Sequence, residues 1–378
     1  MRVLLSTYGS RGDVEPMVAL AVRLQELGAE VRCCAPPDEE FRELLTRGGV
    51  PLVPFPRPWR SWQRPPSAEE RRRRVADFIS AQYATVADAA AGCDVIVATA
   101  MSQFVGPSVA EKLGIPYRCV LFCPDVLDGL DGKGFDELFG EPVNAQRATI
   151  GLPPVGDVGR FMFTARPLLA ADQILGPWLG HAGFDVMQTG AWILPDERPL
   201  PAELLSFLDA GEPPVYVGFG SMRTVDGDTA RAAIEAIRAQ DRRVLVGRGW
   251  AGLGLVDDRD DCFVTGVVNQ QELFTRVATV MHHGGAGTTT TAARAGAPQV
   301  VVPQGGDQVY WGGRVAALGI GATHDGPVRS GASLSTALTT ALSPCTRARA
   351  TAIAAEVGTG GAMRAAQLVL AGDAAERL

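Results

Sequence analysis

The chain has 378 residues, of which 46% are hydrophobic and 20% charged, a composition that excludes a disordered or fibrous protein. This length exceeds what one hydrophobic core usually serves, so two domains are expected. The 35 Lys and Arg residues are outnumbered by 42 Asp and Glu residues, and the net charge of −7 argues against nucleic-acid binding.

No segment of the sequence predicts a membrane anchor or a secretory signal. No apolar run approaches the ~20 residues that span a bilayer, and the N-terminal stretch becomes polar after a few apolar residues. The seven cysteines show neither disulfide nor zinc spacing. We therefore expect buried free thiols in a cytoplasmic protein without membrane insertion.

The first half of the chain alternates short apolar runs with amphipathic stretches. Strands are predicted over 3–7, 30–34, 94–98 and 117–122. Apolar residues at helical spacing predict a helix over 14–27, which ends before Gly28. Strand–helix–strand units at this spacing form right-handed crossovers and a parallel sheet. The polar, glycine-rich stretch 124–153 is expected to be a mobile loop.

The second half repeats this alternation. Strands are predicted over 214–219, 242–246, 262–264, 279–281 and 299–302, and a helix over 228–239. Three prolines within seven residues make the stretch 189–201 a stiff connector between the halves. The predicted fold class is α/β, with two doubly wound Rossmann-like domains facing each other across a cleft. The N-terminal domain would comprise 1–195 joined by a C-terminal helix at 358–378, and the C-terminal domain would comprise 196–357.

The most informative motif is HHGGAGT at 282–288, which follows a predicted strand and opens a Thr- and Ala-rich helix. Adjacent glycines let the backbone approach a ligand closely, and a helix start presents unpaired N–H groups and the positive end of the helix dipole. The motif predicts an anion site suited to a pyrophosphate, to which His283 can donate a hydrogen bond. A glycine-rich turn with a satisfied histidine is the structural alternative.

Asp307 and Gln308 follow the next predicted strand. Their side chains offer acceptors and donors that suit sugar hydroxyls, although Asp307 could equally be a helix N-cap. Because neighbouring strands of a parallel sheet end at the same edge, we expect these two residues to face the same ligand as the pyrophosphate site.

At this point the motifs resemble those of a known family. The stretch HHGGAGT, followed by AGAPQVVVP and DQ, is similar to the donor-binding signature of inverting, metal-independent GT-B glycosyltransferases. The N-terminal MRVLLSTYGSRGDVEPM, the connector QTGAWILPDERPLPAEL and the strand PPVYVGFGSM resemble the same group, so the resemblance covers nearly the whole chain. It is most specific for the actinobacterial glycopeptide-antibiotic (vancomycin/teicoplanin-type) glycosyltransferases.

The resemblance implies a role for individual residues of this sequence. It makes Asp13 the general base. It places around the nucleoside diphosphate the residues Ser10, Arg11, Ser221, His283, Gly285, Gly287 and Thr288. It places Asp307 and Gln308 at the donor sugar, and Trp250 and Val268 near the nucleobase. It implies a UDP- or TDP-sugar as co-substrate, and neither a cofactor nor a metal.

One departure concerns the acceptor side. Between Leu127 and Phe135 the chain has only DGLDGKG, where the family carries a longer loop. Acceptor contacts are expected from the segment 123–140 and from Trp59 and Trp62, which offer flat apolar surface to an aromatic aglycone. An ordinary packed loop is the alternative for the two tryptophans.

Asp13 also has a structural interpretation. It directly precedes the first amphipathic helix, where Asp is a favoured N-cap, and Pro16 in the first turn fits that role. The residues alone favour capping, whereas the resemblance favours catalysis.

Three rival patterns are weaker. The stretch GRGWAG at 247–252 matches the G-x-G-x-x-G dinucleotide motif, but no helix is predicted after it. The acidic run 257–261 contains a D-x-D motif, but it precedes a strand, and a solvated turn is expected there. The pair His282-His283 is too tight for both rings to ligate one metal, so no metal site is predicted.

The sequence thus favours an inverting glycosyltransferase that moves a hexose from a UDP- or TDP-sugar to a hydroxyl of a glycopeptide aglycone. One alternative is a nucleotide-sugar epimerase or hydrolase of the same fold, and another is a glycosyltransferase for a different bulky natural product such as a macrolide. An NAD-dependent enzyme and a non-catalytic protein of the same fold also remain open. The presence of Asp13, His283 and Asp307 argues against the last of these.

Overall fold

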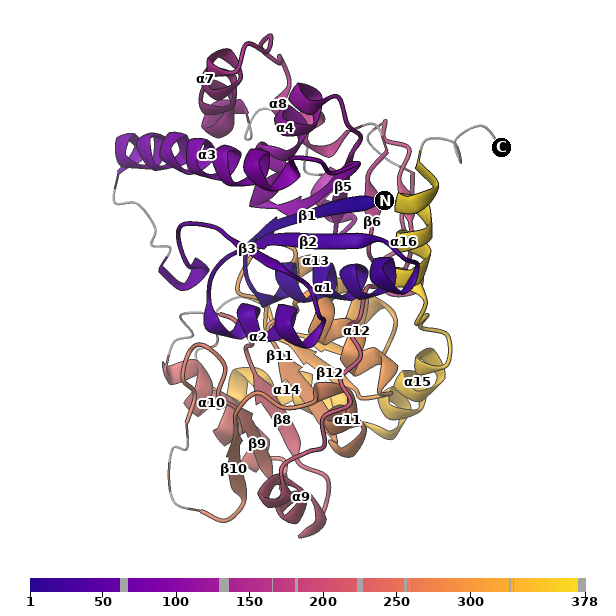
Figure 1. Ribbon diagram of the computed structural model, residues 1–378. Coiled ribbons are helices and arrows are strands. Elements are labelled where there is room, and N and C mark those ends of the chain that lie inside the picture. The colour runs from indigo at the N-terminus through magenta and orange to yellow at the C-terminus, as the bar shows by residue number, and fades with distance from the viewer. Residues whose placement is uncertain are drawn as a thin grey trace. The chain divides into compact units, whose positions relative to one another are not determined.

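A computed structural model describes residues 1–61, 67–128, 136–164, 166–180, 183–222, 227–254, 257, 259–325, 328 and 330–372. The chain forms two compact units, each built on one parallel sheet (Figure 1). Unit 1 comprises Met1–Ala171, Pro177–Leu194 and Thr359–Leu378. Unit 2 comprises Asp172–Gly176 and Pro195–Gly358.

Unit 1 contains a seven-stranded parallel sheet in the order β3-β2-β1-β4-β5-β6-β7. Its strands are β1 (Arg2–Tyr8), β2 (Glu30–Ala35), β3 (Leu52–Pro54), β4 (Val95–Ala100), β5 (Tyr117–Leu121), β6 (Leu168–Leu169) and β7 (Met187–Gln188). The four strands predicted in this half are all present. The sequence did not indicate β3, β6 and β7, because a strand of two or three residues shows no periodicity.

The helices of unit 1 lie around this sheet. They are α1 (Arg11–Glu26), α2 (Glu39–Arg47), α3 (Ala68–Ala90), α4 (Gly106–Leu113), α5 (Asp125–Asp128), α7 (Glu141–Thr149), α8 (Val158–Phe163) and α16 (Gly361–Ala371), with short turns at η1 (Trp59–Ser61), η2 (Met101–Phe104) and η3 (Asp136–Gly140). The C-terminal α16 packs against α1 (Figure 1) and buries Ala365, Ala366 and Val369. The last described helix therefore completes the core of unit 1.

The prediction of a loop over 124–153 is wrong, because most of the described residues in this stretch are helical. The turn η3 and helix α7 occupy 136–149, and the ring of Phe139 stacks on Phe104 with the centroids 3.7 Å apart. Arg147, only 1% exposed, donates to Glu111 Oε2 at 2.9 Å and to Pro153 O at 2.8 Å. The sequence did not predict α7 because Arg147, which is buried and paired, occupies a position where helical periodicity requires an apolar residue.

Unit 2 contains a six-stranded parallel sheet in the order β10-β9-β8-β11-β12-β13. Its strands are β8 (Val215–Gly218), β9 (Val244–Gly247), β10 (Cys262–Thr265), β11 (Thr279–His282), β12 (Gln299–Val301) and β13 (Gly321–Thr323). Its helices are α9 (Ala202–Asp209), α10 (Gly227–Arg238), α11 (Gln270–Leu273), α12 (Ala286–Arg294), α13 (Gln308–Ala317), α14 (Gly331–Ala341) and α15 (Pro344–Ala354), with a short turn at η4 (Phe274–Arg276).

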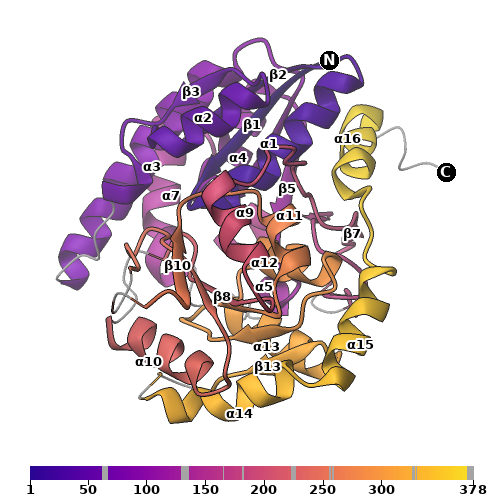
Figure 2. The same cartoon turned by 90° about the horizontal axis from the view of Figure 1, so that it is seen from below.

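Two apolar clusters fill the two faces of this sheet. Helices α10 and α14 lie side by side (Figure 2) and contribute Ile234, Ile237 and Leu338 to one cluster. Helices α9 and α12 contribute to the other, together with Phe274. Burial of both faces explains why the strands of this sheet are nearly continuous apolar runs.

The strand order reverses direction once in each sheet, between β1 and β4 in unit 1 and between β8 and β11 in unit 2. Open parallel sheets bind their ligands at such switch points, outside the carboxyl ends of the strands. Each unit therefore has one edge at which a ligand is expected.

The described residues of the acidic run 257–261 form a solvent-accessible turn, as predicted, and two of its carboxylates are paired. Arg238 of α10 donates to both oxygens of Asp257, at 2.6 and 2.8 Å, and to both oxygens of Asp261, at 2.9 and 2.6 Å. These bonds lower the pKa of Asp257 to about 2. The D-x-D pattern is thus part of an ion-pair cluster, with Asp258 outside the described residues.

Two other expectations concern cysteines and membranes. All seven cysteines are free thiols and six of them are buried, as predicted, whereas Cys345 is exposed. Among the described helices, none combines the length and the hydropathy needed to cross a bilayer.

Candidate active site

The predicted donor residues of unit 2 meet at the carboxyl edge of its sheet. Strand β8 pairs with β11 and β9, and β11 pairs with β12, so the loops that follow these strands are neighbours. The backbone N–H of Trp250 donates to Gly220 O at 2.9 Å. The side chain of Gln308 donates to Met222 Sδ at 3.6 Å. The loops that carry Ser221, Trp250 and Gln308 therefore lie together at the switch point beside His283.

The imidazole of His283 lies over the first turn of α12. A Cβ atom on Gly285 would come within 2.6 Å of His283 Nε2, so this approach requires glycine. Gly285 is the N-cap of α12 and no side chain caps the helix, which leaves the first-turn N–H groups for a ligand or water. Gly287 and Thr288 belong to this turn. Beside it, His283 Nδ1 is buried and has no hydrogen-bond partner in the described part of the chain.

Both histidines of the motif are neutral at physiological pH. Burial lowers the pKa of His283 to about 4. Burial, and secondarily the neighbouring His283, lower the pKa of His282 to about 3. His283 is therefore a neutral hydrogen-bond donor, and the positive field at this site comes from the start of α12.

His282 has a positioning role that the sequence analysis did not foresee. Its Nδ1 accepts the N–H of Gly284 at 3.1 Å, so Nε2 carries the proton and donates to Gln299 Oε1 at 2.9 Å. The amide of Gln299 in turn donates to Thr289 O at 3.3 Å. This chain of bonds links the glycine turn to α12 and to β12. The pairing of a strand-end histidine with a residue on the next strand is visible only in the folded sheet.

These pKa values predict a loss of stability in mild acid. The histidine pKa is 6.5 in the unfolded chain and about 3 to 4 in the folded one, so below pH 6.5 the unfolded state binds protons that the folded state cannot. Above pH 6.5 the two imidazoles are neutral in the unfolded chain as well, so the folded protein has its full stability there. This stability falls by up to ~1.4 kcal/mol per pH unit per imidazole towards pH 4. Urea unfolding at pH 7 and pH 5 measures this loss.

The control for this prediction is His283→Gln, which cannot titrate. The loss of unfolding free energy between pH 7 and pH 5 should be smaller in this variant, because one of the two groups has been removed. Equal losses in the variant and the parent chain would contradict the assignment of a neutral, buried His283.

Asp307 and Gln308 lie at the start of α13. Asp307 occupies the N-cap position, but its side chain makes no capping bond, and Oδ2 instead accepts from Trp311 Nε1 at 3.3 Å. The capping alternative for this carboxylate is therefore wrong. Gln308 Oε1 accepts the N–H of Gln304 at 2.7 Å, which closes the loop between β12 and α13.

The nucleobase residues predicted from the resemblance follow β9 and β10. Trp250 is half-buried in the turn after β9. Val268 is half-buried and packs against the apolar cluster of α9 and α12. No helix follows the G-x-G-x-x-G stretch through residue 254, so the context of a dinucleotide motif is missing there.

Asp13 occupies the corresponding switch point of unit 1, where β1 leads into α1. Ser10 is the N-cap of α1 and Asp13 is the third helical residue, so Asp13 is not the predicted N-cap itself, but its carboxylate completes the capping box of this helix. Asp13 Oδ2 accepts the backbone N–H of Ser10 at 2.7 Å and its hydroxyl at 3.2 Å. A Cβ on Gly9 would lie only 2.2 Å from Asp13 Oδ2, so a glycine is needed where the carboxylate folds back over the turn. These contacts fix the direction of the carboxylate.

Arg11 and the acceptor-side tryptophans have the following places. Arg11 donates to Glu15 Oε2 at 2.6 Å along α1. Trp59 packs edge-on against Tyr8, with the ring centroids 5.6 Å apart, and its backbone N–H donates to Asp38 Oδ2 at 2.6 Å, which fits the packed-loop alternative. Trp62 and residues 129–135 of the expected acceptor segment lie outside the described residues.

In the described part, no group of three His, Cys, Asp or Glu side chains could hold a metal ion.

Two known domain families match the chain. Residues 3–129 match the glycosyltransferase family 28 N-terminal domain, and residues 259–362 match the erythromycin biosynthesis protein CIII-like C-terminal domain. Similar solved structures include the calicheamicin glycosyltransferase CalG4 (TM-score 0.75, 15% identity, 100% of this chain and 99% of that chain). Another is glycosyltransferase VinC in complex with DTDP (TM-score 0.65, 20% identity, 97% and 100%). Fold and matches define this protein as a GT-B glycosyltransferase.

Relatives from Amycolatopsis orientalis are much more similar in sequence. Glycosyltransferase GtfE is 52% identical over 408 aligned positions, which cover 100% of this chain and 99% of GtfE. Vancomycin aglycone glucosyltransferase is 50% identical over 406 positions, which cover 100% of this chain and 98% of the relative. The chain belongs to this family, the vancomycin-type glycosyltransferases. Both alignments are longer than the chain, so these relatives contain residues that have no counterpart here.

Proposed function

We propose that this enzyme moves a hexose from a UDP- or TDP-sugar to a hydroxyl of a glycopeptide aglycone, with inversion at the anomeric carbon. The observation that carries the proposal is the buried imidazole of His283 beside the uncapped start of α12. A relative of 50% identity is named for glucosyl transfer to the vancomycin aglycone, and a solved structure of the same fold holds DTDP. In this proposal 196–357 binds the donor, and 1–195 with 358–378 binds the acceptor.

The donor half of the proposed site stabilises the leaving diphosphate. The first-turn N–H groups of α12 and the neutral N–H of His283 would donate to phosphate oxygens, where negative charge develops as the sugar departs. The proposed diphosphate contacts are Ser10, Arg11, Ser221, His283, Gly285, Gly287 and Thr288. Asp307 and Gln308 would hold the sugar, and Trp250 and Val268 the base.

The acceptor half of the proposed site needs a base. Asp13 would take the proton of the acceptor hydroxyl while the oxygen of that group attacks the anomeric carbon. The bond from the anomeric carbon to the diphosphate oxygen breaks on the opposite face, and its electron pair leaves with the diphosphate. One displacement of this kind inverts the configuration.

Metal independence is a separate prediction. A metal is unnecessary where helix N–H groups and His283 neutralise the diphosphate, so EDTA should leave the transfer rate unchanged. The measurement is the initial rate with and without EDTA, followed by addition of Mg²⁺ or Mn²⁺. A strict requirement for either ion would contradict the proposed donor site.

The proposed function is tested by incubating the protein with a panel of UDP- and TDP-sugars and glycopeptide aglycones and reading the product masses. A mass increase of one hexose on an aglycone is expected. Epimerised or hydrolysed donor in the absence of acceptor would favour the alternative reactions, and transfer to a macrolide alone would change the acceptor class. Free thiols in the interior suit the reducing cytoplasm, which we include as the proposed location.

A further inference from the structure

Helix α13 begins beside the glycine motif of the proposed donor site. A Cβ atom on Gly284 would lie 2.9 Å from Gln308 O and 3.3 Å from Gln308 Cβ, so the first turn of α13 packs closely against this motif. Asp307 immediately precedes that turn and is half-buried. Further along, α13 packs against β12 and β13. The helix therefore connects the donor edge to the core of unit 2.

The carboxylate of Asp307 is held by a side chain and not by the helix backbone. Asp307 has helical dihedral angles (φ −63°, ψ −12°), whereas a capping side chain requires an extended backbone at the N-cap. Residues four positions apart lie on the same face of a helix, and long side chains lean back towards its start. The indole Nε1 of Trp311 therefore reaches Asp307 Oδ2, at 3.3 Å.

Trp311 is suited to hold a carboxylate in place because the core of unit 2 fixes its position. Its side chain is only 1% exposed and is among the largest that are fully buried. A group that is already fixed loses less conformational entropy when a ligand binds than a free group does. The structural alternative is the opposite dependence: a buried indole N–H needs an acceptor, and Asp307 would merely supply it.

We propose that Trp311 is a positioning residue for the donor sugar, because its indole N–H fixes the carboxylate that contacts the sugar hydroxyls. The inference rests on the proposed function, in which Asp307 holds the sugar. The diphosphate has separate proposed contacts at His283 and the start of α12. Removal of the indole N–H should therefore weaken the binding of the sugar and leave the binding of the diphosphate unchanged.

The direct test compares nucleotides with and without a sugar on the full-length protein. Isothermal titration calorimetry gives the Kd of UDP, UDP-glucose, TDP and TDP-glucose. In Trp311→Phe, which keeps an aromatic ring without the N–H, the ratio of the nucleotide-glucose Kd to the nucleotide Kd should rise about 3- to 10-fold, the usual effect of one lost hydrogen bond. Unchanged Kd values for UDP and TDP show that the variant is folded. An unchanged ratio, or an equal loss of affinity with and without glucose, would overturn the proposal.

A double-mutant cycle tests whether Trp311 acts through Asp307. Asp307→Ala should raise the same ratio by itself. In this background Trp311→Phe should have no further effect, because two residues that act as one unit are not additive. Additive effects of the two replacements would contradict the positioning role, since the indole would then affect the sugar by another route.

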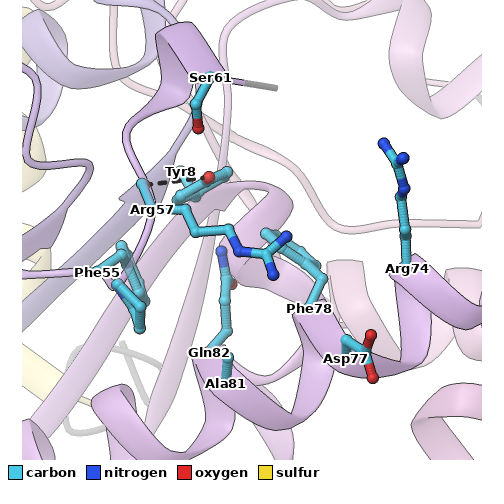
Figure 3. A pocket seen from close by; sticks show the side chains of 10 residues that line it. Tyr8, Phe55, Arg57, Ser61, Arg74, Asp77, Phe78, Ala81 and Gln82 are labelled. Atoms are coloured by element: carbon cyan, nitrogen blue, oxygen red, sulfur yellow. Dashed lines mark hydrogen bonds between the residues drawn. The ribbon is translucent and has the colours of Figure 1, made fainter. Parts of the chain in front are cut away.

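Two other aromatic donors provide matched controls. Trp192 of unit 1 is 2% exposed, and its Nε1 donates to Thr189 Oγ1 at 2.9 Å. The hydroxyl of Tyr8 donates to Arg57 O at 3.2 Å, in a pocket of unit 1 that Gln82 also lines (Figure 3). Trp192→Phe and Tyr8→Phe each remove one hydrogen-bond donor, and neither should change the ratio. A rise as large as in the α13 variant would show a general loss of packing and would contradict the proposal.

The transfer assay distinguishes this inference from the proposed function. A raised ratio in Trp311→Phe, in a protein that glycosylates no glycopeptide, would uphold the role of Trp311 and contradict only the proposed acceptor. An unchanged ratio in an enzyme that transfers the sugar to a glycopeptide would uphold the function and overturn the role of Trp311. A parent protein that binds none of the four nucleotides would contradict both.

Discussion

Replacement of Asp13 by Asn should reduce the transfer rate by ~10²–10⁴-fold, the usual contribution of a positioned general base. An acceptor hydroxyl is a weak nucleophile, and even a phenol, with a pKa of about 10, is mostly protonated at neutral pH. An amide cannot take this proton. It can still accept the N–H of Ser10 that the carboxylate accepts at 2.7 Å, so the start of α1 is preserved.

The stability and donor binding of Asp13→Asn should therefore be almost normal. The loss of a negative charge from the first helical turn destabilises a protein by about 0.3–1 kcal/mol. Thermal melting and titration with UDP and TDP measure both properties. The matched control is Asp157→Asn: Asp157 caps α8 by accepting the Arg160 N–H at 2.8 Å, so its replacement also removes a negative charge from a helix start, and it should lower stability by a similar small amount and leave the rate unchanged. Near-normal transfer by Asp13→Asn would reduce Asp13 to a structural residue.

Replacement of His283 by Ala should weaken donor binding or slow transfer by ~10–100-fold. The imidazole lies beside Gly285, the N-cap of α12, and its N–H would donate to a charged phosphate oxygen. Titration with UDP and TDP and steady-state kinetics in donor and acceptor locate the effect. We expect it in the donor parameters and in kcat, with the acceptor KM unchanged.

A second buried histidine of unit 2 serves as the control. His324 is 8% exposed, and its Nε2 lies 3.2 Å from Ser333 Oγ, beyond β13 and outside the proposed donor contacts. His324→Ala should lower stability and leave donor binding unchanged. Unchanged binding of UDP and TDP by His283→Ala, or equal losses in both variants, would contradict the anion site.

The regular part of the fold could be predicted because its information is local. Apolar periodicity marked β1 and α1 in the first half and β8 and β11 in the second, and these elements are present close to the predicted residues. Strands buried on both faces are continuous apolar runs, and a crossover helix between two of them implies parallel pairing. The motif at 282–288 could be assigned to a strand end and a helix start for the same reason.

The roles of individual polar side chains depended on contacts between segments distant in the sequence. Arg238 of α10 neutralises Asp257 and Asp261 in the turn before β10, and His282 is fixed by Gln299 on the neighbouring strand. Gln82 lies on a helix whose pattern makes it an ordinary polar residue until Tyr8 and the loop after β3 enclose it. Periodicity along the chain reports which face of an element is buried. It contains no information about which polar groups meet there, because that follows from strand order and helix packing.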